Sequence, residues 1–307
     1  MGSSSTKWFW GIFLSLVFIG LMFVGISFLF FASVIKNVST TEYYSAGSGE
    51  KIGLIEINDV IINSEDVVRQ IKKFREDKSI KAILLRINSP GGGVAASQEI
   101  YEEVKYTRDH GKLVVVSMGS IAASGGYYIS CGSNLIVANP GTLTGSIGVI
   151  ARFISVKELA DKLGIEFTDV ISGELKDSGS PYKKMTDKDK EYFQEVVNNT
   201  FGQFLDVVSK ERKINIDTLR KYANGRVFTG LQAKEIGLVD SIGTFEDAIR
   251  ITAKIAGIEG EPRIIRERRS HSLFERLIGT SVEDITGIKQ KLFDEPILQY
   301  RFEPAKY

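Results

Sequence analysis

The chain has 307 residues, of which 25% are charged and 43% are hydrophobic, and its formal net charge is +1. This average composition argues against a disordered or collagen-like chain, and the near-zero charge argues against a surface that binds nucleic acid. Cys131 is the single cysteine, which excludes an internal disulfide bond. With two histidines, His110 and His271, the chain also lacks the ligands for a Cys/His zinc site. The composition therefore predicts neither a metal centre nor a nucleic-acid partner.

The N-terminal part of the chain contains one long apolar segment. Residues 8–35 carry no charged side chain and lie between Lys7 and Lys36. Because about 20 apolar residues cross the core of a bilayer, this segment is long enough to span a membrane. A cleaved signal peptide is the alternative, but its apolar core usually has only about 7 to 15 residues. We therefore predict a cytoplasmic tail over residues 1–7, a single-pass transmembrane anchor over residues 8–35, and an extracytoplasmic body.

After a polar linker at residues 36–50, short apolar runs alternate with amphipathic segments. Continuous apolar runs indicate strands that are buried on both faces, and intervening helices favour a mostly parallel sheet covered by helices. We therefore expect an α/β domain over residues 51–260 and a C-terminal extension over residues 261–307. The expected strands are residues 52–57, 82–87, 113–117, 135–138 and 165–171. The expected helices are residues 64–77, 95–110 and 186–212.

The end of the C-terminal extension has the pattern of a strand. In residues 297–303 apolar and polar side chains alternate, with Leu298, Tyr300 and Phe302 on one side. A period of two residues is typical of a strand, so we expect this segment to join the edge of a sheet. Such a strand could enter a binding groove of its own chain as an inhibitor. An edge strand or a frayed tail without a function is the alternative.

Three glycine-rich segments, residues 88–94, 118–128 and 140–148, each follow an apolar run. In the first, consecutive glycines allow backbone N–H groups to approach a ligand closely, but the GxxxxGK[ST] pattern of a phosphate-binding loop is absent. In the second, Ser124 stands among alanine and glycine residues at the expected start of a helix. Small neighbours leave its hydroxyl accessible, and a helix N-terminus favours negative charge. A tight turn and close helix packing are the alternatives.

A serine nucleophile requires a base, and histidine is scarce in this chain. His110 is expected at a helix-to-strand turn on the face away from the glycine-rich segments. A lysine can replace histidine when burial removes its amine from water. Lys176 follows the expected strand at residues 165–171, at the sheet edge where the glycine-rich segments are expected. Spacing alone leaves its role open.

Five motifs in this order carry a resemblance to a known family: INSPGGGV, SMGSIAASGGYYIS, TGSIGV, SGELKD and RVFTGLQAKEIGLVD. They resemble the short, membrane-anchored form of bacterial signal peptide peptidase A, a Ser/Lys peptidase, over about residues 52–257. The resemblance implies an α/β spiral of ββα units, as in the Clp protease and crotonase superfamily. It further implies that Ser124 is the nucleophile, Lys176 the general base and Ser146 the hydroxyl that orients the lysine amine. Gly91 matches an oxyanion-hole donor, and Gly92 is a second candidate.

The same resemblance implies a function and an assembly. It predicts a serine endopeptidase, without metal or cofactor, that degrades cleaved signal peptides and other apolar peptides at the extracytoplasmic membrane face. It also implies a preference for small or aliphatic side chains at the cleaved bond. The expected assembly is a closed ring in which neighbouring subunits supply the serine and the lysine of one site. A crotonase-like acyl-CoA enzyme and a non-catalytic membrane scaffold are the two alternatives.

Overall fold

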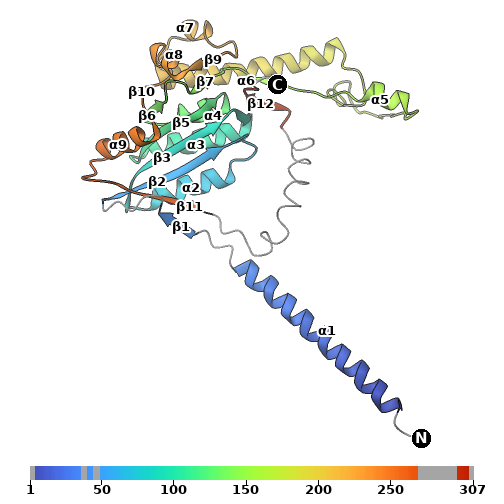
Figure 1. The fold of residues 1–307 in the computed structure, drawn as a ribbon. Coiled ribbons are helices and arrows are strands. Elements are labelled where there is room, and N and C mark those ends of the chain that lie inside the picture. Colours follow the sequence, from blue (N-terminus) through green and yellow to red (C-terminus); the bar gives the residue numbers. More distant parts are fainter. Residues whose placement is uncertain (1–3, 36–39, 44–48, 269–295, 304–307) are drawn as a thin grey trace. The chain divides into compact units, whose positions relative to one another are not determined.

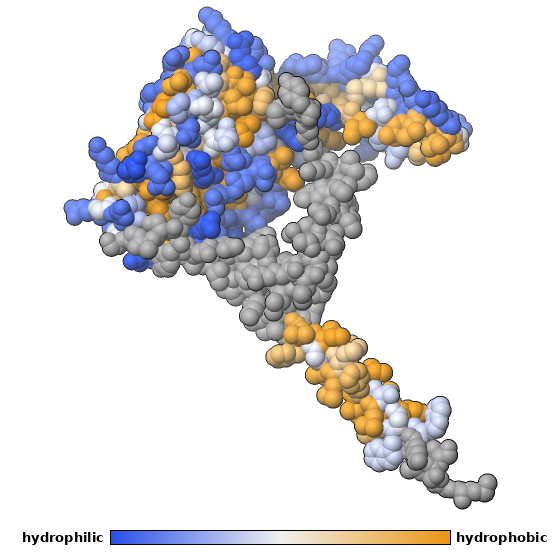
Figure 2. Space-filling view, viewed as in Figure 1, coloured by the Kyte–Doolittle hydropathy of each residue, from blue (hydrophilic) through white to orange (hydrophobic). Residues whose placement is uncertain are grey.

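A computed structural model describes residues 4–35, 40–43, 49–268 and 296–303 of the chain. The chain divides into two compact units, one with residues 1–42 and 267–294 and the other with residues 43–266 and 295–307. The first unit contains helix α1 (Ser4–Ile35) and most of the short strand β1 (Thr40–Tyr43). Within α1, Trp8–Leu29 has a mean hydropathy of 2.7 and is a candidate membrane span, which is coloured orange in Figure 2. The expected anchor is therefore a helix of sufficient length and apolarity.

A mostly parallel sheet forms the centre of the second unit (Figure 1). Its principal strands are ordered β11–β2–β3–β5–β6–β10, and each pair of neighbours in this order is parallel. Strand β7 extends the sheet by pairing in parallel with the end of β5 and antiparallel with β9. The strands are β2 (Lys51–Asn58), β3 (Ile80–Ser89), β5 (Leu113–Ala123), β6 (Leu135–Ala138), β7 (Leu143–Gly145), β9 (Val227–Thr229), β10 (Ser241–Ile242) and β11 (Arg263–Arg268).

Helices cover both faces of this sheet, which explains why its strands are continuously apolar. Leu54, Leu84 and Val115 pack with residues of helix α9 on one face. Their neighbours Ile55 and Leu85 point to the other face and join the larger core, to which α2, α3, α4 and α6 contribute side chains. The helices of this unit are α2 (Glu65–Glu76), α3 (Val94–Asp109), α4 (Gly125–Ser130), α5 (Lys157–Lys162), α6 (Asp187–Arg212), α7 (Ile216–Arg220), α8 (Gly230–Glu235) and α9 (Phe245–Ile255).

Most of the elements expected from the sequence are confirmed. Strand β6 has the predicted bounds, and α6 begins after Thr186, whose side chain forms a capping box with Asp189. The strand predicted at residues 165–171 is wrong, because this segment has no strand and its side chains are exposed. Val170, for example, is 98% exposed. Apolar content alone indicated burial there, but the segment lies outside the sheet and has no neighbouring strand with which to pair.

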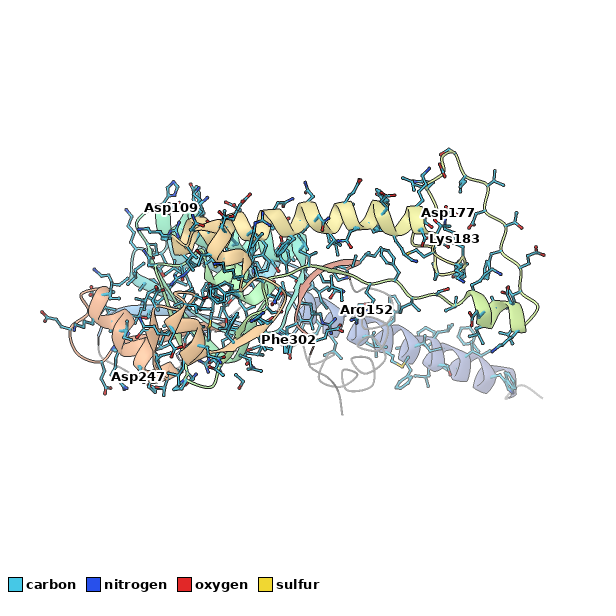
Figure 3. All side chains as sticks on the ribbon, turned by 90° about the horizontal axis from the view of Figure 1, so that it is seen from above. Asp109, Arg152, Asp177, Lys183, Asp247 and Phe302 are labelled. Atoms are coloured by element: carbon cyan, nitrogen blue, oxygen red, sulfur yellow. The ribbon has the colours of Figure 1, made fainter. Side chains whose placement is uncertain are left out.

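Residues 152–195 form a projection from the sheet that we call the arm. It consists of the loop that carries α5 and the first turns of α6, and both Figure 1 and Figure 3 show it extending away from the rest of the unit. Asp177 and Lys183 are labelled near the N-terminal end of α6 in Figure 3. Large apolar side chains are exposed along the arm and gather on one side of it in Figure 2. They include Ile154, Leu159, Leu163, Phe167, Val170 and Ile171.

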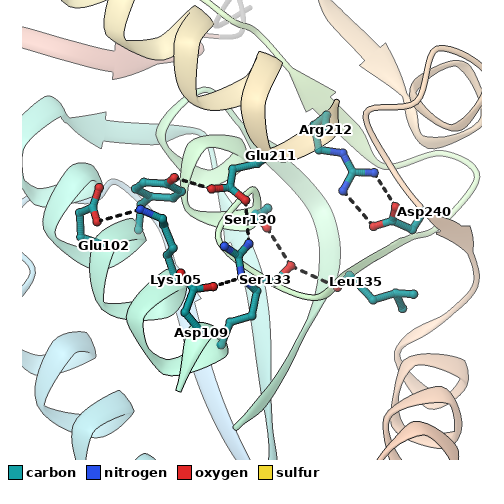
Figure 4. A network of polar contacts seen from close by, with 11 residues as sticks. Glu102, Lys105, Asp109, Ser130, Ser133, Leu135, Glu211, Arg212 and Asp240 are labelled. Atoms are coloured by element: carbon teal, nitrogen blue, oxygen red, sulfur yellow. Dashed lines mark hydrogen bonds and ion pairs between the residues drawn. The ribbon is translucent and has the colours of Figure 1, made fainter. Parts of the chain in front are cut away.

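The C-terminal end of α6, in contrast, is held firmly to the sheet unit by a polar network (Figure 4). Glu211 accepts hydrogen bonds from Tyr101 Oη at 2.9 Å and from Arg108 Nη1 at 2.7 Å. Arg212 donates two bonds to Asp240, with Nη1–Oδ2 and Nη2–Oδ1 distances of 3.0 and 2.5 Å. These contacts fix the base of the arm, because α6 is one continuous helix from Asp187 to Arg212.

The C-terminal part of the chain also belongs to the fold of this unit. Strand β11 pairs in parallel with β2, so the central sheet continues beyond residue 260. A second, small sheet has the order β4–β12–β8, with both pairs antiparallel. Its strands are β4 (Gly91–Gly93), β8 (Ile150–Ala151) and β12 (Leu298–Arg301). The strand predicted within residues 297–303 is therefore confirmed, and it lies between segments that are far apart in the sequence.

Candidate active site

Ser124 stands between strand β5 and helix α4, at a sharp change of chain direction. Its backbone has φ = +53° and ψ = −113°, an unusual conformation for a residue with a side chain. Its N–H donates to the carbonyl of Gly145 at 2.8 Å, and its carbonyl accepts from the N–H of Tyr128 at 2.8 Å. Ser124 is only 1% exposed. The turn thus holds Ser124 at the C-terminal end of the central strand β5, in a position shielded from solvent.

Ser146 lies beside Ser124 because their two strands are paired. In the register of β5 and β7, Ala123 is the partner of Gly145, and each serine directly follows one of these residues. Ser146 also has a positive φ, of +50°. Its N–H donates to the carbonyl of Arg226 at 2.8 Å, and its Oγ donates to the carbonyl of Gly225 at 3.2 Å. The structure therefore brings these two predicted site residues together.

The glycines of β4 form the other side of the site. A Cβ on Gly91 would lie 2.6 Å from the nitrogen of Gly125 and 2.0 Å from the carbonyl oxygen of Tyr300. Any side chain is thus excluded, and Gly91 also has φ = +98°, a value that favours glycine. Its N–H donates to Ser89 Oγ at 3.1 Å. Gly91 therefore contacts the residue after Ser124 directly, but its own N–H is already bonded.

Gly92 faces a different direction from its neighbours. The carbonyl of Gly91 accepts from Ile61 N at 3.0 Å, and the N–H of Gly93 donates to Ile61 O at 2.7 Å. Because backbone polar groups alternate along a strand, the N–H and C=O of Gly92 point to the opposite side, toward β12. Its register partner there is Tyr300. From the sequence, Gly92 ranks below Gly91 as an oxyanion donor and Gly125 is not among the candidates, although its position directly after Ser124 is a signal for such a donor.

Strand β12 occupies the groove between β4 and β8 as an extended peptide would. The carbonyl oxygen of Tyr300 lies at the junction of Gly91 and Gly125, 3.1 Å from the place of a Cβ on Gly125. On the far side of this residue, Phe302 N donates to the carbonyl of Pro90 at 2.8 Å. A segment of the same chain therefore runs past the serine with one of its peptide carbonyls directed at the two glycines.

The side chain of Tyr300 fills a deep aromatic pocket. It is fully buried, with its ring centroid 5.1 Å from that of Tyr128 and 4.6 Å from that of Phe204. Its hydroxyl donates to the carbonyl of Thr200 at 3.2 Å. Burial raises the pKa of Tyr300 above its ordinary value and raises that of Tyr128 to about 12. Both phenols are therefore neutral at physiological pH, and the pocket presents an uncharged aromatic wall.

The tail is also fastened by a charged contact beyond β12. Arg152, directly after β8, donates through both terminal nitrogens to the carboxylate of Glu303, with an Nη1–Oε1 distance of 2.6 Å. A cavity of about 560 Å³ lies beside this contact, between Ser146 and the tail. Phe201, Asn224 and Phe302 are among the residues that line it. The site therefore has free volume next to Ser146 even while β12 is in place.

Lys176 is the one predicted site residue that the chain does not bring to the others. It is exposed, and its N–H donates to the carbonyl of Gly173 at 2.9 Å in a turn on the arm. Figure 3 labels the next residue, Asp177, near the N-terminal end of α6, away from the sheet in which β5 leads to Ser124. Among the described residues, no group of three or more His, Cys, Asp or Glu side chains is arranged to hold a metal ion.

A buried serine on a sharp turn at the end of a central strand, beside the glycines of β4 and an extended peptide segment, has the features expected of a serine hydrolase. The model of peptidase family S49 matches residues 106–259, and the Clp protease model matches residues 51–138. Protease slr0021 of Synechocystis sp. is 40% identical over 217 residues, which cover 70% of this chain and 78% of that protein. Signal peptide peptidase SppA of Enterococcus faecium is 34% identical over 275 residues, or 85% of this chain and 80% of that protein.

Protease 4 of Salmonella typhi is 39% identical over 223 residues, which are 70% of this chain but 36% of that longer protein. Among solved structures, a ClpP1 mutant from Listeria monocytogenes aligns with a TM-score of 0.45 and 17% identity, covering 64% of this chain and 93% of that chain. The chain belongs to peptidase family S49. It is a serine peptidase, so the acyl-CoA enzyme and the scaffold that the sequence left as alternatives are set aside.

Proposed function

We propose that Ser124 and Lys176 form the catalytic dyad of a peptidase that cleaves extended, apolar peptides. Ser124 Oγ attacks the scissile carbonyl carbon while the neutral amine of Lys176 takes the hydroxyl proton. Lys176 then gives this proton to the leaving amine as the C–N bond breaks. Water then attacks the acyl-enzyme carbonyl while Lys176 takes a proton from it, and Lys176 returns this proton to Ser124 Oγ as the bond between Oγ and the acyl carbon breaks. Ser146 orients the lysine amine, as the resemblance implies.

The N–H groups of Gly125 and Gly92 are the oxyanion donors that we favour. Gly125 directly follows the nucleophile, and the N–H of Gly92 points toward β12 and its register partner Tyr300. Gly91, the first choice from the sequence, has its N–H engaged by Ser89 Oγ and contributes the close approach of the backbone instead. Each donor to an oxyanion typically supplies about 3 to 4 kcal/mol of transition-state stabilisation.

The observation that carries this proposal is the position of strand β12. It pairs antiparallel with β4 and β8, and the Tyr300 carbonyl lies against Gly91 and Gly125 beside the serine. Addition of a strand to an exposed sheet edge is a general mode of peptide recognition, in which backbone bonds supply affinity and pockets supply specificity. We infer that substrate peptides occupy the groove that β12 fills in this chain.

We propose that Lys176 acts on Ser124 of a neighbouring subunit in a closed ring. The arm places Lys176 in solvent, whereas a general base needs an environment that keeps its amine neutral. The exposed apolar side chains of the arm, such as Val170 and Phe167, suit burial against a second copy of the chain. Head-to-tail contacts of this kind repeat around a ring, so every subunit can supply one arm and receive another.

We further propose that the natural substrates are signal peptide remnants in the membrane. The relative in Enterococcus faecium carries the name signal peptide peptidase, and the candidate span Trp8–Leu29 suits an enzyme that works at a bilayer. With the N-terminus in the cytoplasm, the catalytic unit is extracytoplasmic. Apolar remnants that leave the bilayer then reach the groove from the same side.

Complementation tests the dyad and its shared arrangement together. Ser124→Ala and Lys176→Ala are each expected to lose peptidase activity, because each removes one member of the dyad, while thermal stability stays unchanged. The two variants are then co-expressed, and mixed assemblies containing both are isolated through two different affinity tags. Recovered hydrolysis of a peptide substrate supports a shared site, because some interfaces then pair an intact serine with an intact lysine.

The possible results separate the two parts of the proposal. Mixed assemblies that remain at background contradict the shared site but leave the dyad intact. Full peptidase activity of Lys176→Ala, in contrast, would refute the proposed dyad itself. Labelling of Ser124 with a fluorophosphonate, compared between the wild type and Lys176→Ala, reports the nucleophile independently of any choice of peptide.

A further inference from the structure

The turn that carries Lys176 is attached to the start of α6 by one buried carboxylate. Asp189 is 2% exposed, and its Oδ1 accepts from Ser178 Oγ at 2.5 Å. Its Oδ2 accepts from Thr186 N at 2.9 Å and lies 3.4 Å from Lys183 Nζ. Both oxygens are therefore used, and they join two separate parts of the preceding loop to the first turn of the helix.

Asp189 is unusual in its surroundings. Between residues 152 and 195, all of which the structure describes, it is the only ionisable side chain that is buried. The capping box with Thr186 explains one of its contacts but not the bond from Ser178 or the ion pair with Lys183. Hydrogen bonds from Ser178 and Thr186 lower the pKa of Asp189 well below its ordinary value, so the carboxylate is ionised at physiological pH.

The contacts continue to the residue next to Lys176. Lys183 Nζ pairs with Asp177 Oδ1 at 2.7 Å as well as with Asp189, so a chain of ionic contacts runs from α6 to Asp177. Ser178 N also donates to the carbonyl of Leu175 at 3.2 Å. The two neighbours of Lys176 in the chain are therefore both linked to the Asp189 carboxylate, Leu175 through Ser178 and Asp177 through Lys183.

We propose that Asp189 is a positioning residue for the peptidase reaction, holding the turn at residues 173–180 so that Lys176 is presented in one orientation to the serine it serves. This inference rests on the proposed role of Lys176 as general base. A base must approach to about 2.6–3.2 Å of the group it deprotonates, and a displacement of about 1 Å can cost 100-fold in rate. A flexible loop at the end of an exposed arm would not meet that requirement without such an anchor.

The first experiment compares three variants of the full-length protein. Asp189→Asn removes the charge and leaves one acceptor oxygen instead of two. We expect its kcat to fall about 10- to 100-fold, with KM within about twofold, because the turn shifts while the groove is unchanged. Ser178→Ala removes one bond to the same carboxylate and should show a smaller fall in kcat. Asp187→Asn is the matched control, since Asp187 lies in the same turn of α6 but its side chain is 99% exposed.

Amide hydrogen exchange of residues 173–180 gives a readout that does not depend on catalysis. We expect faster exchange in Asp189→Asn and Ser178→Ala than in the wild type and Asp187→Asn, with exchange in the central sheet unchanged. If Asp189→Asn does not fold, Ser178→Ala carries both measurements. Wild-type kcat in the folded variants would overturn the inference, as would exchange that increases throughout the catalytic unit.

Mixed assemblies then separate positioning from a general structural role. Asp189→Asn co-assembled with Ser124→Ala should regain activity, because the Ser124→Ala chain supplies an intact arm. Asp189→Asn co-assembled with Lys176→Ala should not, because every arm is then defective. Two results overturn the inference. In one, both mixtures regain peptidase activity. In the other, neither mixture regains it although Ser124→Ala and Lys176→Ala complement each other. Full activity of Lys176→Ala alone would refute the proposed dyad, which is a separate failure.

Discussion

Replacement of Tyr300 by alanine tests whether β12 competes with substrate. The Tyr300 side chain is fully buried among aromatic rings, and its hydroxyl bonds to the carbonyl of Thr200. Truncation of a buried aromatic side chain to alanine typically costs about 3–5 kcal/mol. Since 1.4 kcal/mol corresponds to a factor of ten, Tyr300→Ala should shift the equilibrium between bound and released tail by about 100- to 4,000-fold. The groove of this variant should therefore be open to added peptide.

The assay is the initial rate of cleavage of a fluorogenic apolar peptide. We expect kcat/KM to rise in Tyr300→Ala and in a chain that ends before Pro296, because an intramolecular competitor is weakened or removed. Ile297→Ala is the control, since Ile297 lies in the same tail but is 58% exposed. Thermal unfolding should be measured in parallel to show that the core is retained. If neither the substitution nor the truncation raises kcat/KM, β12 is only a structural strand of the small sheet and the inhibitor idea is wrong.

Three further predictions concern stability, thiol reactivity and specificity. Arg212→Ala leaves Asp240 without its bidentate partner. Because the Arg212 side chain is only 11% exposed, we expect the free energy of unfolding, measured in urea, to fall by about 3 kcal/mol. A fall below about 1 kcal/mol would contradict this. Burial raises the pKa of Cys131 to about 12, so the folded state retains the proton. The stability that comes from the protonated Cys131 thiol is therefore fully present below about pH 9 and declines as the pH rises toward 12. At pH 8 the Cys131 thiol of the native protein should resist iodoacetamide, and it should react once the protein is unfolded. Finally, the pocket that holds Tyr300 should accept a tyrosine or phenylalanine side chain of the substrate at the cleaved bond, in addition to the small and aliphatic side chains that the resemblance implies. The test is the cleavage-site profile of a peptide library, with Ser124→Ala as the inactive control. A profile without aromatic residues at the cleaved bond would refute this prediction.

The sequence predicted those parts of the molecule that depend on local patterns. Apolar runs located β2, β3, β5 and β6, and the T-D-K-D pattern at Thr186 located the start of α6. The glycine-rich segments indicated where Ser124 and Ser146 lie, since residues that follow neighbouring parallel strands meet at one edge of a sheet. That the two serines follow paired residues is a matter of register, which the sequence does not contain.

Other features depend on tertiary or quaternary surroundings and were therefore missed. The apolar residues 165–171 suggested a buried strand, but an apolar run determines neither the element nor its burial, and here the segment belongs to the arm and its side chains are exposed. Which of Gly91 and Gly92 donates to an oxyanion stays a prediction, because it depends on the direction of single N–H groups; here the N–H of Gly91 donates to Ser89 Oγ. The alternating pattern of the tail predicted a strand, but only the fold places Tyr300 against the glycines.

The backbone of Ser124 has a consequence for the evolution of this fold. A serine at φ = +53° and ψ = −113° is in a region that glycine adopts freely and other residues avoid, at a cost of about 1–3 kcal/mol. Glycine at this position would relax the turn and would also remove the nucleophile that we propose. Selection for stability alone thus favours the inactive sequence, and the serine persists only while hydrolysis benefits the cell. A relative with glycine at this position would be expected to keep the fold and to lack peptidase activity.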